Sequence, residues 1–290
     1  MKGTRQMNAF KKTAVATVLV TISSFTLAFV PNVSTGWTLV KSLNTIKIYK
    51  EGSKENYMQV LDISKGATLE LVQEYAGYIY FPQSLAVNKN MHAFNKYRAT
   101  DWWNKTGNPV SLTNGAFFFT SYSPAPLSFP IRMNNSYAQG NDTDPGAIDR
   151  RQLEISGNTV DVLPYNESRI QYGPNPLVLS GLSPYFSKSS DRSVGRTFVC
   201  ARYVGGASPW LMYIMSLQGE KQADARITIQ NWGCDLQNKT VQLDGGGSTA
   251  LVYNTGSGTK RMNGKTYNSI TQQYVIEDRA VPQILVVRGN

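Results

Sequence analysis

Histidine and cysteine are scarce in this chain. Its 290 residues include one histidine, His92, and two cysteines, Cys200 and Cys234. These three side chains are too few for a structural zinc site of the Cys/His kind, which takes four such ligands. A Ser-His-Asp triad would have to use His92, and nothing in the sequence places that ring beside a nucleophile. We therefore interpret His92 as a packing or capping residue.

The sequence also lacks a concentrated stripe of positive charge. Its formal net charge is +10, of which four charges come from Lys2, Arg5, Lys11 and Lys12 in an N-terminal stretch without acids, so that six are spread over the rest. Nucleic-acid binding requires clustered Lys and Arg, so we expect no nucleic-acid partner. A diffuse excess suits an anionic substrate, an anionic cell surface or ordinary surface composition.

Only one long uncharged run occurs, over residues 13–30, directly after those four basic residues. This pattern predicts a secretory signal peptide. The cleavage site is poor, with Pro31 after Ala28-Phe29-Val30, and the run is close to the lower limit of about 18 residues that span a bilayer. An uncleaved anchor, with membrane association through residues 13–30, is the alternative. Both interpretations predict an exported protein, whether secreted, periplasmic or at the cell surface.

The predicted export places the two cysteines in an oxidising compartment. In an oxidising compartment, an even number of cysteines favours a bridge, so we predict a disulfide between Cys200 and Cys234. The Cα atoms should then lie roughly 4.4–6.8 Å apart. Two buried thiols are the alternative.

Strand-like segments dominate the chain after residue 35. Period-2 alternation or short apolar runs predict strands at 45–49, 57–63, 68–72, 110–113, 153–155, 160–163, 196–204, 210–217, 240–243, 250–253 and 283–287. Helices are predicted at 83–96 and at 223–236, the latter with Ile227, Ile229, Trp232 and Leu236 buried. Since strands outnumber helices without alternating regularly with them, we predict an α+β fold with a mixed β-sheet core. We expect a single domain over 36–290, with residues 1–35 forming the signal peptide or anchor and a short linker.

The most distinctive segment is VQLDGGGSTA at 241–250. An apolar strand ends at the carboxylate of Asp244, and three glycines and two hydroxyl residues come next: Gly245, Gly246, Gly247, Ser248 and Thr249. Successive glycines are entropically costly, and they fit a backbone that takes positive φ or approaches a ligand closely. Their N–H groups can form an anion-binding nest. A glycine hairpin with Asp244 as turn residue is the alternative. No lysine follows the glycines and no Gly-x-Ser-x-Gly occurs, which excludes a P-loop and a nucleophile elbow.

Residues 243–252 resemble the LDGGGSSTMV-type signature of the phosphodiester glycosidase family. Further segments resemble that family in its order: the strand at 57–63, TNGAFF at 113–118 (VNGGFF in the family), GPNPLVLSG at 173–181, Gly195-Arg196-Thr197, and the segment at 278–287 (Arg-x-Val-Pro-Asn-Ala-Leu-Val-Val). The resemblance spans roughly residues 45–288. Two departures occur. Ala116 replaces the family's second glycine, and the segment 228–233 lacks the glutamate of the family's Thr-x-x-Glu-Leu-Ala helix.

The resemblance implies hydrolysis of a sugar-1-phosphodiester at the glycosidic C–O bond to phosphate, on a cell-surface or extracellular glycan. Because phosphate leaves easily, the site needs a strong general acid less than ordinary glycosidases do. Asp244 is the expected catalytic carboxylate, as base for water or as stabiliser of an oxocarbenium-like transition state. Arg196 is expected to grip the phosphate. The expected substrate-binding residues are Asn114, Gly115, Gly245, Gly246, Gly247, Ser248 and Arg279.

The expected partner is a sugar-1-phosphodiester or a phosphorylated glycan, and we expect no cofactor. Asp244 beside hydroxyl groups is nevertheless compatible with an oxygen-liganded divalent cation. Because a fold does not guarantee activity, a non-catalytic carbohydrate- or cell-wall-binding protein on the same scaffold is the main alternative. A surface-anchored structural protein, held by residues 13–30, is a third.

Overall fold

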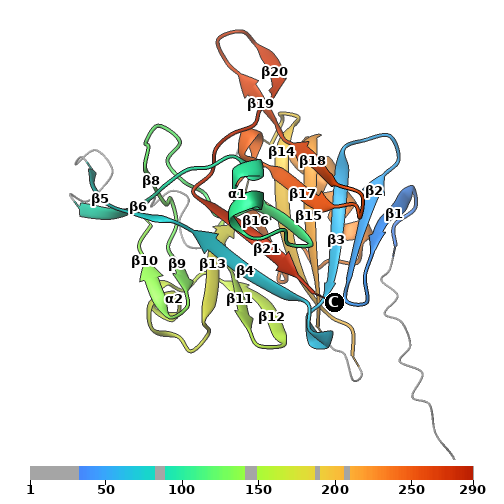
Figure 1. Ribbon diagram of the computed structural model, residues 1–290, viewed down its shortest axis with the longest axis horizontal. Helices are drawn as coiled ribbons and strands as arrows, with labels where there is room; N and C mark the ends of the chain where they lie inside the picture. The colour runs from blue at the N-terminus through green and yellow to red at the C-terminus, as the bar shows by residue number, and fades with distance from the viewer. Residues whose placement is uncertain (1–32, 82–88, 141–148, 187–189, 206–209, 290) are drawn as a thin grey trace, which may run out of the picture.

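The computed structural model describes residues 33–81, 89–140, 149–186, 190–205 and 210–289 (Figure 1). The predicted targeting segment at 13–30 lies outside these ranges. Within them, none of the helices combines the length and the apolar character that crossing a membrane requires.

The larger sheet has eleven strands. Its main order is β1 (Trp37–Ser42), β2 (Ile46–Glu51), β3 (Asn56–Asp62), β15 (Trp210–Glu220), β14 (Val194–Tyr203), β16 (Thr240–Leu243), β13 (Leu177–Leu182), β11 (Arg150–Ser156) and β12 (Thr159–Pro164). Beside β13, β9 (Ile131–Met133) pairs with β10 (Ser136–Ala138). The short β16, which ends just before Asp244, therefore lies well inside this sheet.

A five-stranded sheet lies in front of the larger one in Figure 1. Its order is β18 (Thr259–Asn263), β17 (Ala250–Asn254), β7 (Ser111–Asn114), β21 (Gln283–Arg288) and β4 (Thr68–Gln73). Two smaller units project from this sandwich: β5 (Tyr75–Phe81), β6 (Lys89–Phe94) and β8 (Ala125–Pro126) on one side, and the hairpin of β19 (Lys265–Asn268) and β20 (Gln273–Ile276) at the top of the view.

Both faces of the larger sheet are covered, which explains the almost continuous apolar runs of its central strands. In β14, Val199 belongs to the cluster shared with the smaller sheet, where Leu285 of β21 is also buried. The next residue, Cys200, belongs to a second cluster that includes Ala225 and Ile229 of α3 (Gln222–Asn231). Successive residues of one strand thus contact opposite layers, as the pleat requires.

Two further helices are short. α1 (Ala99–Lys105) contacts the smaller sheet, and the indole N–H of Trp102 donates to the carbonyl of Val281 at 3.0 Å. α2 (Glu167–Tyr172) begins at Asn166, whose side chain accepts the amide hydrogen of Arg169. Such a cap satisfies one of the unpaired N–H groups of a helix start.

The α+β class with few helices is confirmed, but the sheets are not mixed. Every strand pair among the described residues is antiparallel. β15 and β16 both pair with β14 and therefore run in the same direction, and α3 connects them across β14, so these two parallel strands are not paired with each other.

The predicted helix at 83–96 is wrong where the structure describes it, because residues 89–94 form strand β6. Met91 and Ala93 are buried while Asn90 and His92 are more exposed, which is a period of two over these four residues. The helix predicted at 223–236 is confirmed as α3, although it ends at Asn231, shortly before Gly233 with φ +81°. Ile227 is 56% exposed, so its predicted burial is wrong, whereas Ile229, Trp232 and Leu236 are buried.

Candidate functional site

Asp244 lies where the chain passes from the larger sheet to the smaller one. β16 is paired with β14 up to Leu243, and the backbone of Asp244 is then held by the end of β7. The Asp244 carbonyl accepts from Asn114 Nδ2 at 2.7 Å, and the Asp244 amide donates to the carbonyl of Gly115 at 3.3 Å. Its Oδ1 accepts the Gly245 amide hydrogen at 2.9 Å. These contacts fix the backbone on both sides of the carboxylate.

Two of the three glycines are needed for close packing and the third for its backbone conformation. A Cβ at Gly245 would lie 2.8 Å from the carbonyl oxygen of Gly195, and one at Gly247 would overlap the Glu277 carboxylate. Gly246 has φ +60°, a conformation that favours glycine. The segment forms a 3₁₀ turn between β16 and β17, so it is not a hairpin. The Gly245 N–H donates to Asp244 Oδ1, so one of the N–H groups of the expected anion-binding nest is already occupied.

A cleft of about 300 Å³ opens beside this turn. The described residues that line it come from the segments after β7 and β8, the start of β14 and the residues before it, the end of β16, the glycine turn, β19 and the segment between β20 and β21: Phe117, Phe118, Thr120, Ser128, Arg192, Val194, Gly195, Arg196, Gln242, Asp244, Gly245, Gly246, Thr266, Tyr267 and Arg279. Of these lining residues, three are arginines and one, Asp244, is acidic. The cleft therefore favours an anionic ligand.

Arg196 is 2% exposed and begins the long strand β14. Its Nε donates to the carbonyl of Glu220 at 2.9 Å and its Nη2 to that of Arg192 at 3.2 Å. Burial lowers the pKa of Arg196 to about 10, which leaves the guanidinium charged at neutral pH. The Nε–Nη2 edge of this guanidinium is therefore committed to main-chain carbonyls.

Arg279 is held by a carboxylate that the sequence did not single out. Its Nε and Nη2 donate to the two oxygens of Glu277, at 3.1 and 2.7 Å, which is a bidentate ion pair. Its Nη1 reaches Ser248 Oγ at 3.5 Å. Lys96 lies close enough that burial, and then the charge of Arg279, lower the pKa of its ammonium group. Glu277 therefore orients Arg279 over the glycine turn.

Arg192 and Tyr267 were also missed. The guanidinium carbon of Arg192 lies 4.5 Å from the centre of the Tyr267 ring, in a cation–π contact at the rim of the cleft. The only sequence signal for Arg192 was its position four residues before Arg196. Tyr267 carries no signal in a single sequence, because it reaches the cleft through the projecting hairpin of β19 and β20.

Four of the expected substrate-binding residues are not among those that line the cleft: Asn114, Gly115, Gly247 and Ser248. Asn114 is buried, and its Oδ1 accepts from Thr197 Oγ1 at 2.7 Å and from the Ala250 amide at 3.2 Å. It therefore joins β7, β14 and β17 behind Asp244. Ser248 is buried beneath Arg279. Asp244, Arg196, Gly245, Gly246 and Arg279 are the predicted residues that the cleft brings together.

Ala116, which replaces the family's glycine, packs into the main core, and its amide donates to Gln283 Oε1 at 3.4 Å.

Cys200 and Cys234 form a disulfide with Cα atoms 6.0 Å apart, in the core between α3 and the larger sheet. His92 lies on β6, where its ring packs against Tyr78 at 4.9 Å between centroids. No group of three or more His, Cys, Asp or Glu residues suited to a metal ion occurs in the described ranges.

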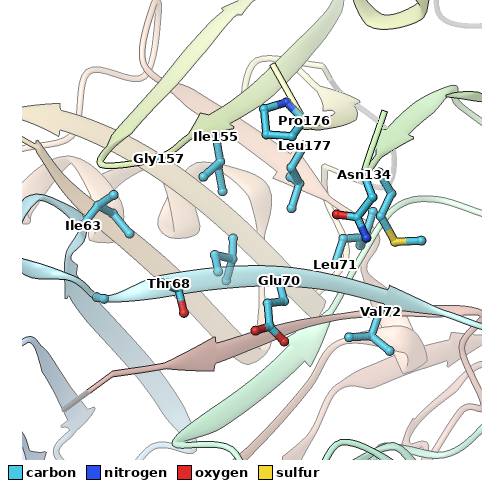
Figure 2. Close-up of a pocket in the computed structure, with 13 residues that line it drawn as sticks. Ile63, Thr68, Glu70, Leu71, Val72, Asn134, Ile155, Gly157, Pro176 and Leu177 are labelled. Atoms are coloured by element: carbon cyan, nitrogen blue, oxygen red, sulfur yellow. The ribbon is translucent and has the colours of Figure 1, made fainter. Parts of the chain in front are cut away.

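A second, larger cleft of about 490 Å³ lies between β4 and the ends of β11 and β13 (Figure 2). Figure 2 shows Leu71, Ile155 and Leu177 directed into the space between these strands, while Glu70 lies on the other side of β4. Glu70 is paired with Arg288. No described lining residue is cationic, so this apolar cleft does not suit a phosphate.

No protein-family model matches the chain, and no curated protein matches it. Several solved structures resemble it, among them the three that follow. The catalytic domain of zebrafish N-acetylglucosamine-1-phosphodiester alpha-N-acetylglucosaminidase, auto-inhibited by its pro-peptide, is 13% identical with a TM-score of 0.47, over 82% of this chain and 90% of that one. A protein of Burkholderia pseudomallei K96243, named as an exported protein, is 11% identical with a TM-score of 0.47, over 84% and 74%.

A hypothetical protein from Synechocystis is 9% identical with a TM-score of 0.39, over 87% of this chain and 61% of that one. All three are distant structural resemblances. The function is therefore inferred from the residues of the Asp244 cleft.

Proposed function

We propose that this chain is an exported hydrolase that cleaves a sugar-1-phosphodiester between the sugar C1 and the phosphate oxygen. The observation that carries the proposal is the gathering of Asp244 with Arg192, Arg196 and Arg279 in one cleft. The resemblance of residues 243–252 to the phosphodiester glycosidase signature supports the reaction. The four basic residues followed by the uncharged run at 13–30 support export.

The cleft has the charge that such a substrate needs. A phosphodiester carries one negative charge, and the departing phosphomonoester gains a second as the bond breaks. Fixed cations that face this developing charge stabilise the transition state more than the ground state. Arg196 is held by carbonyl groups and Arg279 by Glu277, so both guanidinium groups are oriented before a substrate arrives.

Asp244 acts on the sugar side. A water molecule attacks C1, the C1–O bond breaks, and its electron pair leaves on the phosphomonoester oxygen. The Asp244 carboxylate takes the proton of the attacking water or stabilises the positive charge that develops on the sugar. Asp244 is the only acid among the described lining residues, and a phosphate leaving group makes a second carboxylic acid unnecessary.

The test uses the methyl phosphodiesters of several sugar 1-phosphates, with release of free sugar and methyl phosphate as the readout. Asp244→Asn should fold normally and lose about 10²–10⁴-fold in turnover, the usual contribution of a general base. Asp161→Asn is the matched control, because Asp161 lies on the edge strand β12 and its carboxylate is paired with Lys239. In water enriched with ¹⁸O, the label should enter the sugar. Label in the phosphate, or an Asp244→Asn variant with wild-type turnover, would contradict the mechanism.

A non-catalytic carbohydrate-binding protein is the second candidate. It is favoured by the engagement of both arginines within the protein, since Arg279 is paired with Glu277 and one edge of Arg196 is held by carbonyl groups. This candidate predicts saturable binding of a sugar phosphodiester without turnover. In that case Asp244→Asn would change affinity and leave no rate to measure.

A further inference from the structure

Arg192 differs from the other two arginines that line the cleft in what holds its guanidinium group. Arg196 donates to main-chain carbonyls, and Arg279 donates Nε and Nη2 to Glu277. The guanidinium of Arg192 lies instead over the ring of Tyr267, with its central carbon 4.5 Å from the ring centre. None of the salt bridges between described residues involves Arg192.

A contact with an aromatic ring holds a cation without neutralising it. The N–H groups of a guanidinium lie in its own plane, so a contact through its face leaves them able to donate to an anion. A carboxylate partner uses these donors and cancels the charge, as Glu277 does for Arg279. The fork of Arg192 therefore stays open to a phosphate.

The hairpin of β19 and β20 fixes the segment around Arg192 at two points. Besides the contact of Tyr267 with Arg192, the amide of Ser193 donates to the hydroxyl of Tyr274 at 3.4 Å. Tyr274 is the cross-strand partner of Tyr267, and their ring centres lie 5.1 Å apart. The carbonyl of Arg192 accepts from Arg196 Nη2 at 3.2 Å. Both the backbone and the side chain of Arg192 are thus held in place by the protein.

The base of the hairpin is packed against the glycine turn. A Cβ at Gly264, the residue before β19, would lie 2.3 Å from the carbonyl oxygen of Gly246. The Gly264 amide donates to the carbonyl of Thr249 at 2.6 Å, and its carbonyl accepts from the Glu277 amide at 3.0 Å. An isolated hairpin is only marginally stable, but this one is anchored at its base, although it projects from the molecule (Figure 1). The anchored base gives Tyr267 a defined position at the cleft.

We propose that Arg192 makes the bidentate contact with the phosphate of the substrate, and that Tyr267 is the positioning residue that holds Arg192 for this contact. Both residues line the cleft. Two parallel N–H groups of a guanidinium match two phosphate oxygens, which requires the plane of the guanidinium to be oriented. That the phosphate belongs to a sugar-1-phosphodiester rests on the proposed function. The contact with the anion does not, so it is tested first without turnover.

Calorimetric titration with methyl phosphate measures this contact. Arg192→Ala should lower the affinity about 10–100-fold, which corresponds to the usual contribution of hydrogen bonds to charged groups. Tyr267→Leu should lower it about two- to fivefold, the equivalent of an exposed cation–π contact. Tyr267→Phe keeps the ring and should keep the wild-type affinity. The double variant Arg192→Ala, Tyr267→Leu should bind no more weakly than Arg192→Ala alone, because Tyr267 acts through Arg192.

Tyr185→Leu is the matched control. Tyr185 forms a similar contact with Arg226, at 5.0 Å, and neither is among the described residues that line the cleft, so the affinity should not change. Wild-type affinity in Arg192→Ala would overturn the phosphate contact. Additive losses in the double variant, or equal losses in Tyr267→Phe and Tyr267→Leu, would overturn the positioning role. Arg192 is exposed, so Arg192→Ala should fold normally and keeps the proposal testable even if Tyr267→Leu is unstable.

Turnover of the methyl phosphodiester of a sugar 1-phosphate separates the two proposals. Tyr267→Leu should lower kcat/KM by the same factor of about two to five, and Tyr267→Phe should not. Coupling between Arg192 and Tyr267 in the binding of methyl phosphate, without hydrolysis of any ester, refutes the reaction and leaves the positioning role intact. Equal kcat/KM in the wild type, Arg192→Ala and Tyr267→Leu refutes the positioning role and leaves the reaction intact.

Discussion

Removing the Cys200–Cys234 disulfide should destabilise the protein by an amount that the loop length sets. The bridge closes a loop with a sequence separation of 34 residues, which contains β15 and α3. In the chain-entropy model, a loop of this length costs the unfolded state about 12.6 cal/mol/K, or about 3.8 kcal/mol at 25 °C. We therefore expect Cys200→Ala, Cys234→Ala to lower the free energy of unfolding by about 3–4 kcal/mol.

Alanine is the appropriate substitute because both cysteines are buried, and a serine hydroxyl would need a hydrogen-bond partner there. Unfolding is followed in urea by tryptophan fluorescence, since Trp232 is buried in the same cluster. The wild-type protein unfolded with dithiothreitol present should match the double variant. A loss below about 1 kcal/mol, or two titratable thiols in the native wild type, would refute the bridge as a stabilising link.

The other predictions concern packing and pH. Gly247→Ala should cost about 1–3 kcal/mol of stability because its Cβ overlaps Glu277, whereas Gly258→Ala, with open space around it, should stay within about 1 kcal/mol of wild type in the same urea titration. Equal stability of the two variants would contradict this. Burial acts to raise the pKa of Glu154, but hydrogen bonds from Arg169 and Gln152 outweigh it and leave the pKa below its ordinary 4.5. Because the folded value is the lower one, this stabilisation is present above pH 4.5 and is lost as the pH falls through the folded pKa. Glu154→Gln should therefore flatten the decline of stability below about pH 5, and an unchanged decline would show that other carboxylates cause it.

The central strands could be predicted because their sequence pattern results directly from burial. β16 has the predicted bounds, and β4, β14, β15 and β21 are found within a few residues of the expected segments. The short helix α1 and the exposed strand β20 could not be predicted in this way. α1 is held by tertiary contacts such as the Trp102–Val281 hydrogen bond, and β20 is exposed throughout, so neither has a periodic buried face.

The candidate site was predictable to the extent that its residues stand in motifs. Asp244, Arg196 and Arg279 each stand in a segment that resembles the family pattern, and all three line the cleft. The sequence could not show which motif residues face the cleft and which support it from behind. From the sequence, Asn114 was predicted to bind the substrate. In the structure its side-chain amide instead forms hydrogen bonds with Asp244, Thr197 and Ala250. Glu277 is the opposite case, because its importance appears only when its partner Arg279 and its neighbour Gly247 are placed in space.

The position of β21 inside the smaller sheet has a consequence for how the chain is made. β21 pairs with β4 on one side and with β7 on the other, and β4 has no other strand partner in the described sheet. During synthesis, residues 68–73 therefore have no strand to pair with until β21 is made, about two hundred positions later in the chain. A nascent chain shortened before residue 283 lacks the strand that joins β4 to β7 in the smaller sheet. The larger sheet, by contrast, has all its strands before residue 244, so only the smaller sheet depends on the last strand of the chain.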